Sequence, residues 1–380
     1  MPWKVESPMS LRVEFVVFAS QTDANISLLC RRFNISRKTG YKWLARHRAD
    51  PAGILEDRSR RPRNFPGRTQ AAIEDRVADL RLKHPAWGAR KLKRRLEDLG
   101  HRNIPARSTV NDILHRRGLI DPQATGRSVP FKRFERKTPN ELWQMDFKGY
   151  LATASGQCHP LTILDDCSRF NILLRACGNQ QTQTVRSGLI DAMRQYGMPA
   201  CILADNGTPW GSCNPQDYWT QLGVWLIRLG VRIIHGRPYH PQTQGKEERF
   251  HRTLKAEVIG TRSPDDLPQC QHLFDQWRPI YNHQRPHQAL NMQTPASRYR
   301  PSPRVYPETL PAIEYADQDQ VRRVNDVGQI TFKGAVYRMG TAFIGQPVAL
   351  RPSSIDGQIN VFYCHQCIAE IDLRQQIRIR

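Results

Sequence analysis

The sequence lacks any long apolar run. No segment approaches the roughly 18 consecutive apolar residues that a helix needs to cross a bilayer. The apolar stretch Phe15–Ala19 is also too short for the core of a secretory signal peptide. We therefore expect a cytoplasmic protein rather than a membrane or secreted one.

Cysteine is also scarce, with nine residues among 380. They are odd in number and lie mostly in apolar runs such as Cys201–Leu203, which is typical of reduced, buried thiols and argues against a disulfide framework. Cys364 and Cys367 have the spacing of half a zinc site. Since no second ligand pair lies nearby in the sequence, we expect a β-strand that carries two thiols.

Acidic residues are few relative to basic ones. The chain has 35 Asp and Glu against 57 Lys and Arg, which gives a formal net charge of +22. Residues 1–137 hold about 31 Lys and Arg and about 14 Asp and Glu, so most of the excess lies in the first third. Such a surface attracts polyanions. The charge lies on short helices without a broad apolar face, which favours DNA over a membrane surface as the partner.

The length predicts two to four domains, and stretches rich in proline and charge mark the linkers between them. We expect all-α modules at the front, an α/β core in the middle and a small β-barrel at the end. The expected parts are a helix-turn-helix domain at 1–56, a basic linker at 57–68, a second helical domain at 69–121, a linker at 122–138, the core at 139–300 and the barrel at 301–380.

The first helical domain has the pattern of a helix-turn-helix motif. Ile26, Leu29 and Phe33 recur at helical spacing, and Ser36 is placed to cap a second helix. That helix would present its basic face to a DNA major groove, although an ordinary helical hairpin with a solvated face fits the pattern equally. The expected DNA contacts on it are Arg37, Lys38 and Lys42.

The second helical domain repeats this organisation, with helices expected at 71–83, 88–96 and 106–117. The middle helix is basic and amphipathic, and its expected DNA contacts are Arg90, Lys91 and Arg94. The arginines of the linker at 58–68 fit a DNA minor groove, and they fit a solvated tether equally well.

The remainder of the chain predicts β-structure combined with helices. Short strand-like runs and helical stretches alternate in the core, which indicates a mixed sheet with helices on its faces. Core strands are expected at 142–147, 161–165, 170–176, 200–204 and 231–235, and core helices at 182–196, 218–229 and 247–258. Barrel strands are expected at 329–332, 335–339, 347–350 and 358–363.

Three carboxylates stand out by their positions. Asp146 lies inside the first core strand, Asp205 follows the fourth, and Glu248 lies in the first turn of a helix. An acid inside an apolar strand costs desolvation energy unless a charge satisfies it, and a metal ion is the usual solution. Oxygen ligands suit Mg²⁺ or Mn²⁺, and two such ions can activate a nucleophilic oxygen and stabilise a leaving group. Taken singly, Asp205 also fits a turn and Glu248 a helix N-terminus.

These acids occur within motifs of a known family. Three segments resemble the integrase core of retroviral integrases and bacterial insertion-sequence transposases: Trp143–Asp146, Leu203–Gly207 and Pro238–Lys255. The resemblance extends to Tyr281–Leu290 at the end of the core and, for the transposases, to Ile35–Trp43 at the front. It implies a ribonuclease-H-like fold for the core.

The resemblance also implies roles for individual residues. Asp146, Asp205 and Glu248 take the positions of the catalytic acids that bind two Mg²⁺ (or Mn²⁺) ions, and Glu247 competes with Glu248 for the third position. Asp165 and Asp166 resemble a recurrent acidic pair to which we assign a structural or turn role. We expect the histidines of this region to face the loops or DNA rather than a metal; they are His235, His240 and His251.

The helix that begins near Glu248 supports this interpretation on geometric grounds. Glu248, Arg252 and Lys255 share one helical face, so a metal-binding acid is followed by two cations that suit a DNA end. The resemblance implies that the preceding loop is mobile and also contacts DNA. The DNA contacts expected in this region are Tyr239, Gln244, Lys246, Arg252 and Lys255.

Two departures from the family pattern are present. Asp205 and Glu248 lie 43 positions apart, more than in most retroviral integrases, which we attribute to a surface insertion at Thr208–Tyr218. Retroviral integrases carry a His-His-Cys-Cys zinc module at the front, whereas residues 1–137 contain only Cys30, so we expect no zinc site there.

The resemblance therefore implies a DNA transposase. It would cleave strands at the ends of a mobile element in a metal-dependent reaction and transfer the 3′-hydroxyl into target DNA. Its partners would be terminal inverted repeats, target DNA and further copies of itself in a dimer or tetramer, associated with the nucleoid when bound to DNA. A domesticated DNA-binding regulator with an inactive core and a structure-specific nuclease with the same core fold are the alternatives.

Overall fold

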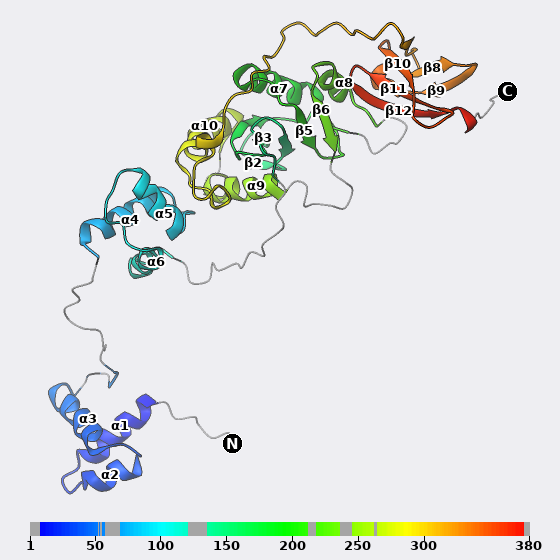
Figure 1. Ribbon diagram of the computed structural model, residues 1–380. Coiled ribbons are helices and arrows are strands. Elements are labelled where there is room, and N and C mark those ends of the chain that lie inside the picture. The colour runs from blue at the N-terminus through cyan, green and yellow to red at the C-terminus, as the bar shows by residue number, and fades with distance from the viewer. Residues whose placement is uncertain are drawn as a thin grey trace. The chain divides into compact units, whose positions relative to one another are not determined.

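The computed structural model describes residues 8–51, 53, 55–57, 69–120, 135–211, 218–235, 245–261 and 264–375 (Figure 1). The chain divides into two compact units, 1–68 and 69–380. Most of the two expected linkers, the centre of the expected insertion, and Tyr239, His240 and Gln244 lie outside the described residues. None of the helices in the described ranges combines the length and apolar character of a membrane span.

The first unit confirms the helix-turn-helix prediction. Ser36 accepts a hydrogen bond from the backbone amide of Thr39 and caps the second helix of the motif. Phe15, Cys30 and Trp43 form the centre of its core. The sequence reasoning missed the first helix, since it treated Phe15–Ala19 only as a short apolar stretch. The helices are α1 (Pro8–Ala19), α2 (Ile26–Arg32) and α3 (Arg37–Ala49).

The second unit begins with three helices, all of which were predicted to within two residues. Trp87, Leu92 and Val110 lie at the centre of their small core. Arg81 connects the ends of the module by donating to the carbonyl oxygens of Trp87, at 2.7 Å, and Leu119, at 3.1 and 3.2 Å. The helices are α4 (Ala71–Lys83), α5 (Ala89–Asp98) and α6 (Arg107–Arg116).

A mixed sheet, as predicted, forms the centre of the second unit. Its order is β2-β3-β1-β5-β6, and β4 also pairs with β3. β1 is antiparallel to β3 and parallel to β5, which is in turn parallel to β6. The sequence reasoning missed the short strand β2. The strands are β1 (Trp143–Phe147), β2 (Leu151–Thr153), β3 (Gly156–Asp165), β4 (Asn171–Cys177), β5 (Cys201–Ala204) and β6 (Arg232–His235).

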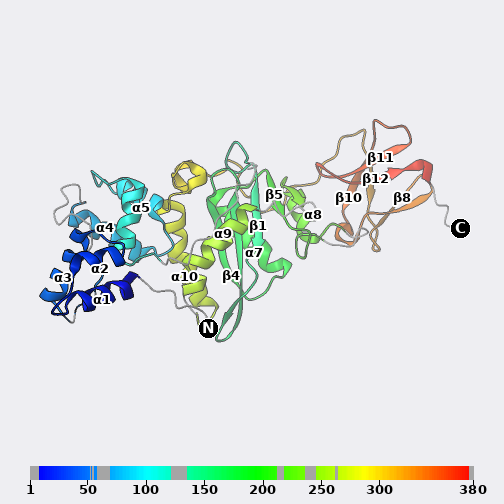
Figure 2. The same cartoon turned by 90° about the horizontal axis from the view of Figure 1, so that it is seen from below.

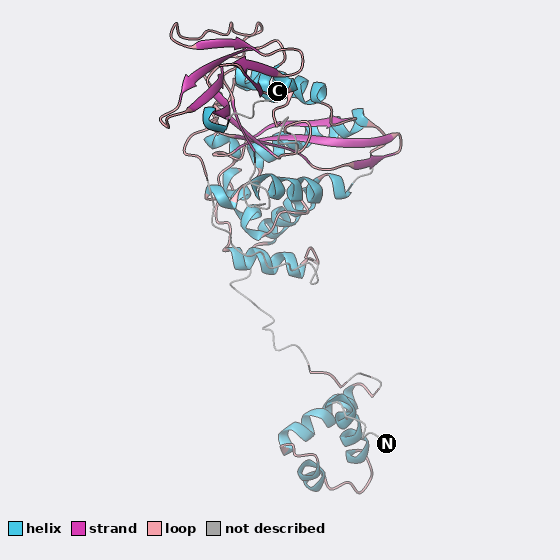
Figure 3. Ribbon diagram, turned by 90° about the vertical axis from the view of Figure 1, so that its right-hand side faces the viewer, coloured by secondary structure: helices cyan, strands magenta, loops and turns pink. Residues whose placement is uncertain are grey.

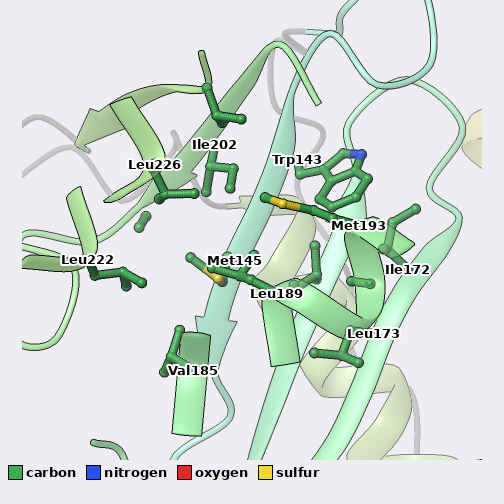
Figure 4. Packing of buried hydrophobic residues seen from close by; sticks show 14 of the residues in the cluster. Trp143, Met145, Ile172, Leu173, Val185, Leu189, Met193, Ile202, Leu222 and Leu226 are labelled. Carbon is green, nitrogen blue, oxygen red and sulfur yellow. The ribbon is translucent and has the colours of Figure 1, made fainter. Parts of the chain in front are cut away.

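Helices cover both faces of this sheet (Figure 1). Seen from below, α9 crosses in front of the strands (Figure 2). Trp143 and Met145 pack toward α7 and α8, where they meet Leu189 and Leu222 (Figure 4). Since side chains alternate along a strand, Gln144 and Asp146 lie on the face covered by α9. The helices are α7 (Thr182–Tyr196), α8 (Gln221–Arg228), α9 (Gly245–Glu257) and α10 (Leu267–Pro279).

Within the described residues that follow, 259–261 and 264–375, the chain forms short helical turns and six further strands. The turns are η3 (Ile259–Thr261), η4 (Ile280–Gln284), η5 (Gln288–Leu290), α11 (Pro295–Arg298), η6 (Thr341–Phe343) and η7 (Leu373–Gln375). The last strands are β7 (Gln320–Arg323), β8 (Gln329–Phe332), β9 (Ala335–Arg338), β10 (Pro347–Pro352), β11 (Gln358–Tyr363) and β12 (Gln366–Asp372).

The β-rich character of the C-terminal segment was predicted, but its strands pair as open sheets (Figure 3). One antiparallel sheet has the order β12-β11-β10-β7, and β8 and β9 form a separate hairpin. Within residues 264–375, no strand pairing closes these sheets into the barrel that we expected. Cys367 lies on β12 as predicted, whereas Cys364 lies in the turn before it, and both thiols are free.

The helix α8 joins the central sheet to the C-terminal strands. Leu222 and Leu226 pack into the core of the central sheet, while Val224 and Ile227 pack into the C-terminal core. Because this helix is buried from two sides, almost all of its residues are apolar. In addition, the Trp219 indole N–H donates to the carbonyl oxygen of Ile368 at 3.2 Å.

Candidate active site

Asp146 lies near the end of β1, on the face of the sheet covered by α9. Its Oδ1 accepts a hydrogen bond from the Phe147 amide at 2.8 Å. Burial raises the pKa of Asp146 to about 6, and the charges of Asp205 and Glu248 act in the same direction. The Phe147 amide and Lys148 oppose this rise. Two further acids from distant parts of the sequence therefore act on the Asp146 carboxyl group.

Asp205 directly follows β5, the parallel neighbour of β1, so the two carboxylates lie at the same edge of the sheet. Its Oδ1 accepts a hydrogen bond from the Gly207 amide at 3.1 Å. Desolvation raises the pKa of Asp205, while the Gly207 amide and His235 oppose the rise. The ring of His235 is held beside it, with Nδ1 2.9 Å from the Asp205 carbonyl oxygen.

Glu248, the third acid of the predicted triad, lies in the first turn of α9, and its side chain is exposed. Arg252 and Lys255 are also exposed on this helix, at the predicted helical spacing. Across the described ranges, no group of three or more His, Cys, Asp or Glu residues is close enough to hold a single metal ion as it stands.

Glu247, the competing candidate, occupies a different environment. Its side chain is 0% exposed, and its Oε2 lies 3.0 Å from the hydroxyl oxygen of Thr162 on β3. Burial, followed by the charge of Asp146, raises the pKa of Glu247 well above its usual value. The two consecutive glutamates therefore point to different places, one into the protein and one to its surface.

His251 is buried beside these groups, whereas we expected it to face a loop or DNA. Its Nε2 lies 2.8 Å from the Thr162 hydroxyl oxygen and 3.6 Å from Glu247 Oε2, and its Nδ1 lies 3.9 Å from Asp146 Oδ2. Burial lowers the pKa of His251 to about 3, so the ring is neutral near pH 7. The sequence reasoning missed this polar cluster because Thr162 carries no signal of its own within an apolar strand.

The acidic pair at the end of β3 is fully buried and hydrogen-bonded, which agrees with the predicted structural role. Asp165 accepts from the Asn140 amide at 2.7 Å and from the Ser168 amide at 2.7 Å. Asp166 accepts from the Gln144 side chain at 2.7 Å, and it forms an ion pair with Lys246. Lys246, which we expected to contact DNA, therefore has an internal acidic partner.

The remaining predicted DNA contacts divide into exposed and engaged side chains. Arg37, Lys38 and Lys42 are exposed on α3, and Lys42 also lies 4.3 Å from the centre of the Trp43 ring. On α5, Arg94 forms an ion pair with Asp98 at 2.8 Å. Lys91 on the same helix has a pKa lowered to about 8, mainly by burial and then by the positive charge of Arg285.

A cavity of about 540 Å³ lies at the N-terminal ends of α5 and α6. Its lining includes Arg90 and Lys91, which were predicted to bind DNA, and four α6 residues that were not predicted. The sequence pattern could have indicated α6 as a DNA-binding helix, because the second helix of a helix-turn-helix motif lies in the major groove of DNA and α6 follows α5 in this way. The four residues are Arg107, Ser108, Asn111 and Asp112.

Known protein families match most of the chain. The integrase core domain matches residues 136–241, and a second integrase core domain matches 229–295. The C-terminal domain of IS481 family transposases matches 319–378. At the front, a helix-turn-helix domain matches 11–63 and a homeodomain-like domain matches 39–114.

Individual relatives are viral polyproteins and bacterial insertion elements. A Gag-Pro-Pol polyprotein of squirrel monkey retrovirus is 32% identical over 31% of this chain and 6% of its own length. An uncharacterized 31.7 kDa protein of insertion element IS407 from Burkholderia multivorans is 25% identical over 42% of this chain and 54% of its own length. The uncharacterized 39.2 kDa protein of insertion element IS476 from Xanthomonas euvesicatoria is 23% identical over 64% of this chain and 69% of its own length. The chain thus spans only a small part of the viral relatives.

Among solved structures, similarity is weak in overall shape. A simian T-cell lymphotropic virus intasome in complex with PP2A regulatory subunit B56 gamma gives a TM-score of 0.40 at 15% identity, covering 78% of this chain and 96% of that chain. The HTLV-2 integrase catalytic core domain in complex with magnesium gives a TM-score of 0.33 at 14% identity, and the match covers 42% of this chain and 97% of that chain. The succession of matched domains and the insertion-element relatives support an insertion-sequence transposase with a retroviral-integrase-type core.

Proposed function

We propose that this transposase cleaves DNA at the ends of a mobile element and joins the freed 3′-hydroxyl to target DNA. The observation that supports the proposal is that Asp146 on β1 and Asp205 at the end of the parallel neighbour β5 lie at one edge of the sheet, and that the charge of Glu248 on α9 also acts on Asp146. Burial is the largest cause of the raised pKa of Asp146, and the charges of Asp205 and Glu248 add to it. A site that repels its own negative charges is one that a divalent cation would stabilise.

The donor set fits the expected metal. Carboxylate oxygens are hard ligands that suit Mg²⁺ or Mn²⁺, and the three acids would hold two such ions. When bound, the ions would supply activation of the attacking oxygen and stabilisation of the leaving oxygen. The protein itself holds the Asp146 carboxylate through the Phe147 amide and the Asp205 carboxylate through the Gly207 amide.

Basic residues would position the DNA. Arg252 and Lys255, exposed on the same helix as Glu248, would bind backbone phosphates of the DNA end. The helices α3 and α6 would contact the terminal repeats, with Arg37, Lys38 and Lys42 on the first and Arg107 on the second. In the joining step one phosphodiester bond forms as another breaks, so no ATP is required.

Two ends must be joined in one event, so we propose a dimer or tetramer on DNA, associated with the nucleoid. The test uses the full chain with Mg²⁺ or Mn²⁺ and DNA that carries the inverted repeats flanking its gene. We expect wild-type protein to nick and join this DNA. E248Q should lose both activities while still binding DNA, and D326N, which changes an exposed acid before β8, should resemble wild type.

The result also separates the alternatives. DNA binding by wild-type protein without any nicking would indicate a domesticated regulator and contradict the proposal. Nicking without strand-transfer product would instead indicate a structure-specific nuclease that uses the same sheet.

A further inference from the structure

The two consecutive glutamates at the start of α9 have separate roles. We propose that Glu247 is a positioning residue, which with Thr162 and His251 attaches the first turn of α9 to β3 and thereby sets Glu248 against Asp146. This inference rests on the proposed function, in which Glu248 and Asp146 are metal ligands.

The hydroxyl group of Thr162 is the centre of the arrangement. Its oxygen lies 3.0 Å from the Asp146 carbonyl oxygen, 3.0 Å from Glu247 Oε2 and 2.8 Å from His251 Nε2. A threonine hydroxyl donates one hydrogen bond and accepts two, so it can donate to the Asp146 carbonyl oxygen on β1 while it accepts from the His251 ring or from a protonated Glu247 carboxyl group on α9. The backbone of Asp146 and the first turn of α9 are therefore held by one shared group.

Lys246 provides a second attachment beside the first. Its ammonium group forms an ion pair with the fully buried carboxylate of Asp166, in the turn that follows β3. Residues 246 and 247 are thus both anchored to β3 or its end, and Glu248 is the next residue along the helix. Because consecutive helical residues point about 100° apart, anchoring Glu247 inward directs Glu248 outward.

A direct metal-binding role for Glu247 fits this geometry poorly. Its carboxyl group is completely buried and borders Thr162 and His251, whereas the side chain of Glu248 is exposed. Moving Glu247 to the sheet edge of Asp146 and Asp205 would break the contact with Thr162 and leave a buried hydroxyl group short of a partner.

The experiment compares E247L, E247Q, T162V and E248Q in the full chain. The matched control is E257Q, which changes another acid of α9 that pairs with Arg285 at 2.9 Å, away from the carboxylate edge. Three quantities are measured: the melting temperature without metal, the rise in melting temperature during a Mn²⁺ titration, and the cleavage rate at each Mn²⁺ concentration.

We expect E247L to melt about 5 °C lower without metal, since it removes one buried polar partner of Thr162 and of His251. Its apparent Mn²⁺ affinity should fall by about tenfold, equivalent to ~1.4 kcal/mol, with cleavage recovering at high Mn²⁺. T162V should behave similarly, and E247Q, which keeps the size and polarity of the side chain, should restore most of what E247L loses. E248Q should melt like wild type without metal and show no Mn²⁺ response at any concentration.

Three outcomes would overturn the inference. If E247Q loses the Mn²⁺ response as completely as E248Q, Glu247 is itself a ligand. If E247L only melts lower, as E257Q should, and keeps normal Mn²⁺ affinity, its role is confined to stability. In both cases wild-type protein still responds to Mn²⁺ and cleaves DNA. A wild-type protein that does neither would contradict the proposed function, and this inference with it.

Discussion

Thr162 lies directly opposite Asp146 in the antiparallel pairing of β1 with β3, and its hydroxyl group contacts the Asp146 carbonyl oxygen. Both side chains lie on the sheet face that α9 covers. A shift of this register by one residue would turn Thr162 away from Asp146 and toward the core beneath α7. The pairing of two short strands therefore determines which polar groups surround the candidate catalytic acid.

The stability of the metal-free protein should depend on the ionisation of Asp146. Its pKa of about 6 in the folded protein lies above the value near 4 of an unfolded chain, so the folded state binds the proton more tightly. Stability should therefore fall as pH rises from about 4 to 6, by an amount on the order of 3 kcal/mol.

The measurement is a series of urea unfolding curves between pH 4 and 7, compared with those of D146N. The difference in stability between the two proteins should change across this window in favour of D146N. A difference that stays constant with pH would show that Asp146 has an ordinary pKa. Saturating Mn²⁺ should abolish the effect in wild type, since a bound cation favours the ionised carboxylate.

Gly40 on α3 should tolerate no side chain. A Cβ there would lie 2.6 Å from the Cys30 sulfur and 2.8 Å from the Phe15 ring, both in the core of the first unit. G40V should destabilise that unit by about 1–3 kcal/mol through overpacking and weaken DNA binding by α3. In the control, G223A on α8, the nearest atom is at 3.5 Å, so melting should stay near wild type. Equal melting of both variants would contradict the close approach of α1, α2 and α3.

The second helical module should bind DNA more through α6 than through α5. Arg107 lies at the exposed start of α6, whereas Arg94 on α5 is held by Asp98 at 2.8 Å. If Arg107 contacts one phosphate, R107A should weaken binding and reduce the slope of log affinity against log salt by about 0.9. R94A should change the slope little. A larger effect of R94A would return the DNA contacts to α5, where the sequence reasoning placed them.

Ile227 should couple the helix α8 to the C-terminal strands. Its side chain is fully buried in the core that β10 and β11 share with Val224. I227A should cost about 2–5 kcal/mol and lower the hydrogen-exchange protection of the β10 and β11 amides. V336A, at an exposed position on β9, should leave this protection unchanged. Unaltered protection in I227A would mean that the C-terminal strands fold without support from α8.

Local patterns were sufficient to locate most helices and strands. The helices at 71–83 and 182–196 were predicted with their bounds, because hydrophobic periodicity is encoded within a few neighbouring residues. The strand β7 was missed, since its four residues are exposed and have no apolar alternation. The expected barrel depended on pairing between strands that are distant in the sequence, which local patterns do not encode. The observed pairings form open sheets instead.

The amino-acid sequence alone determined the kind of protein, since motifs around Asp146, Asp205 and Glu248 keep their spacing whether or not the chain is folded. It left the two glutamates of α9 undecided, because both are acids in the first turn of one helix. The tertiary structure separated them: packing of α9 on β3 buries Glu247 against Thr162 and leaves Glu248 exposed. Burial, and the pKa values that follow from it, depend on contacts between residues 85 positions apart, which no local pattern records.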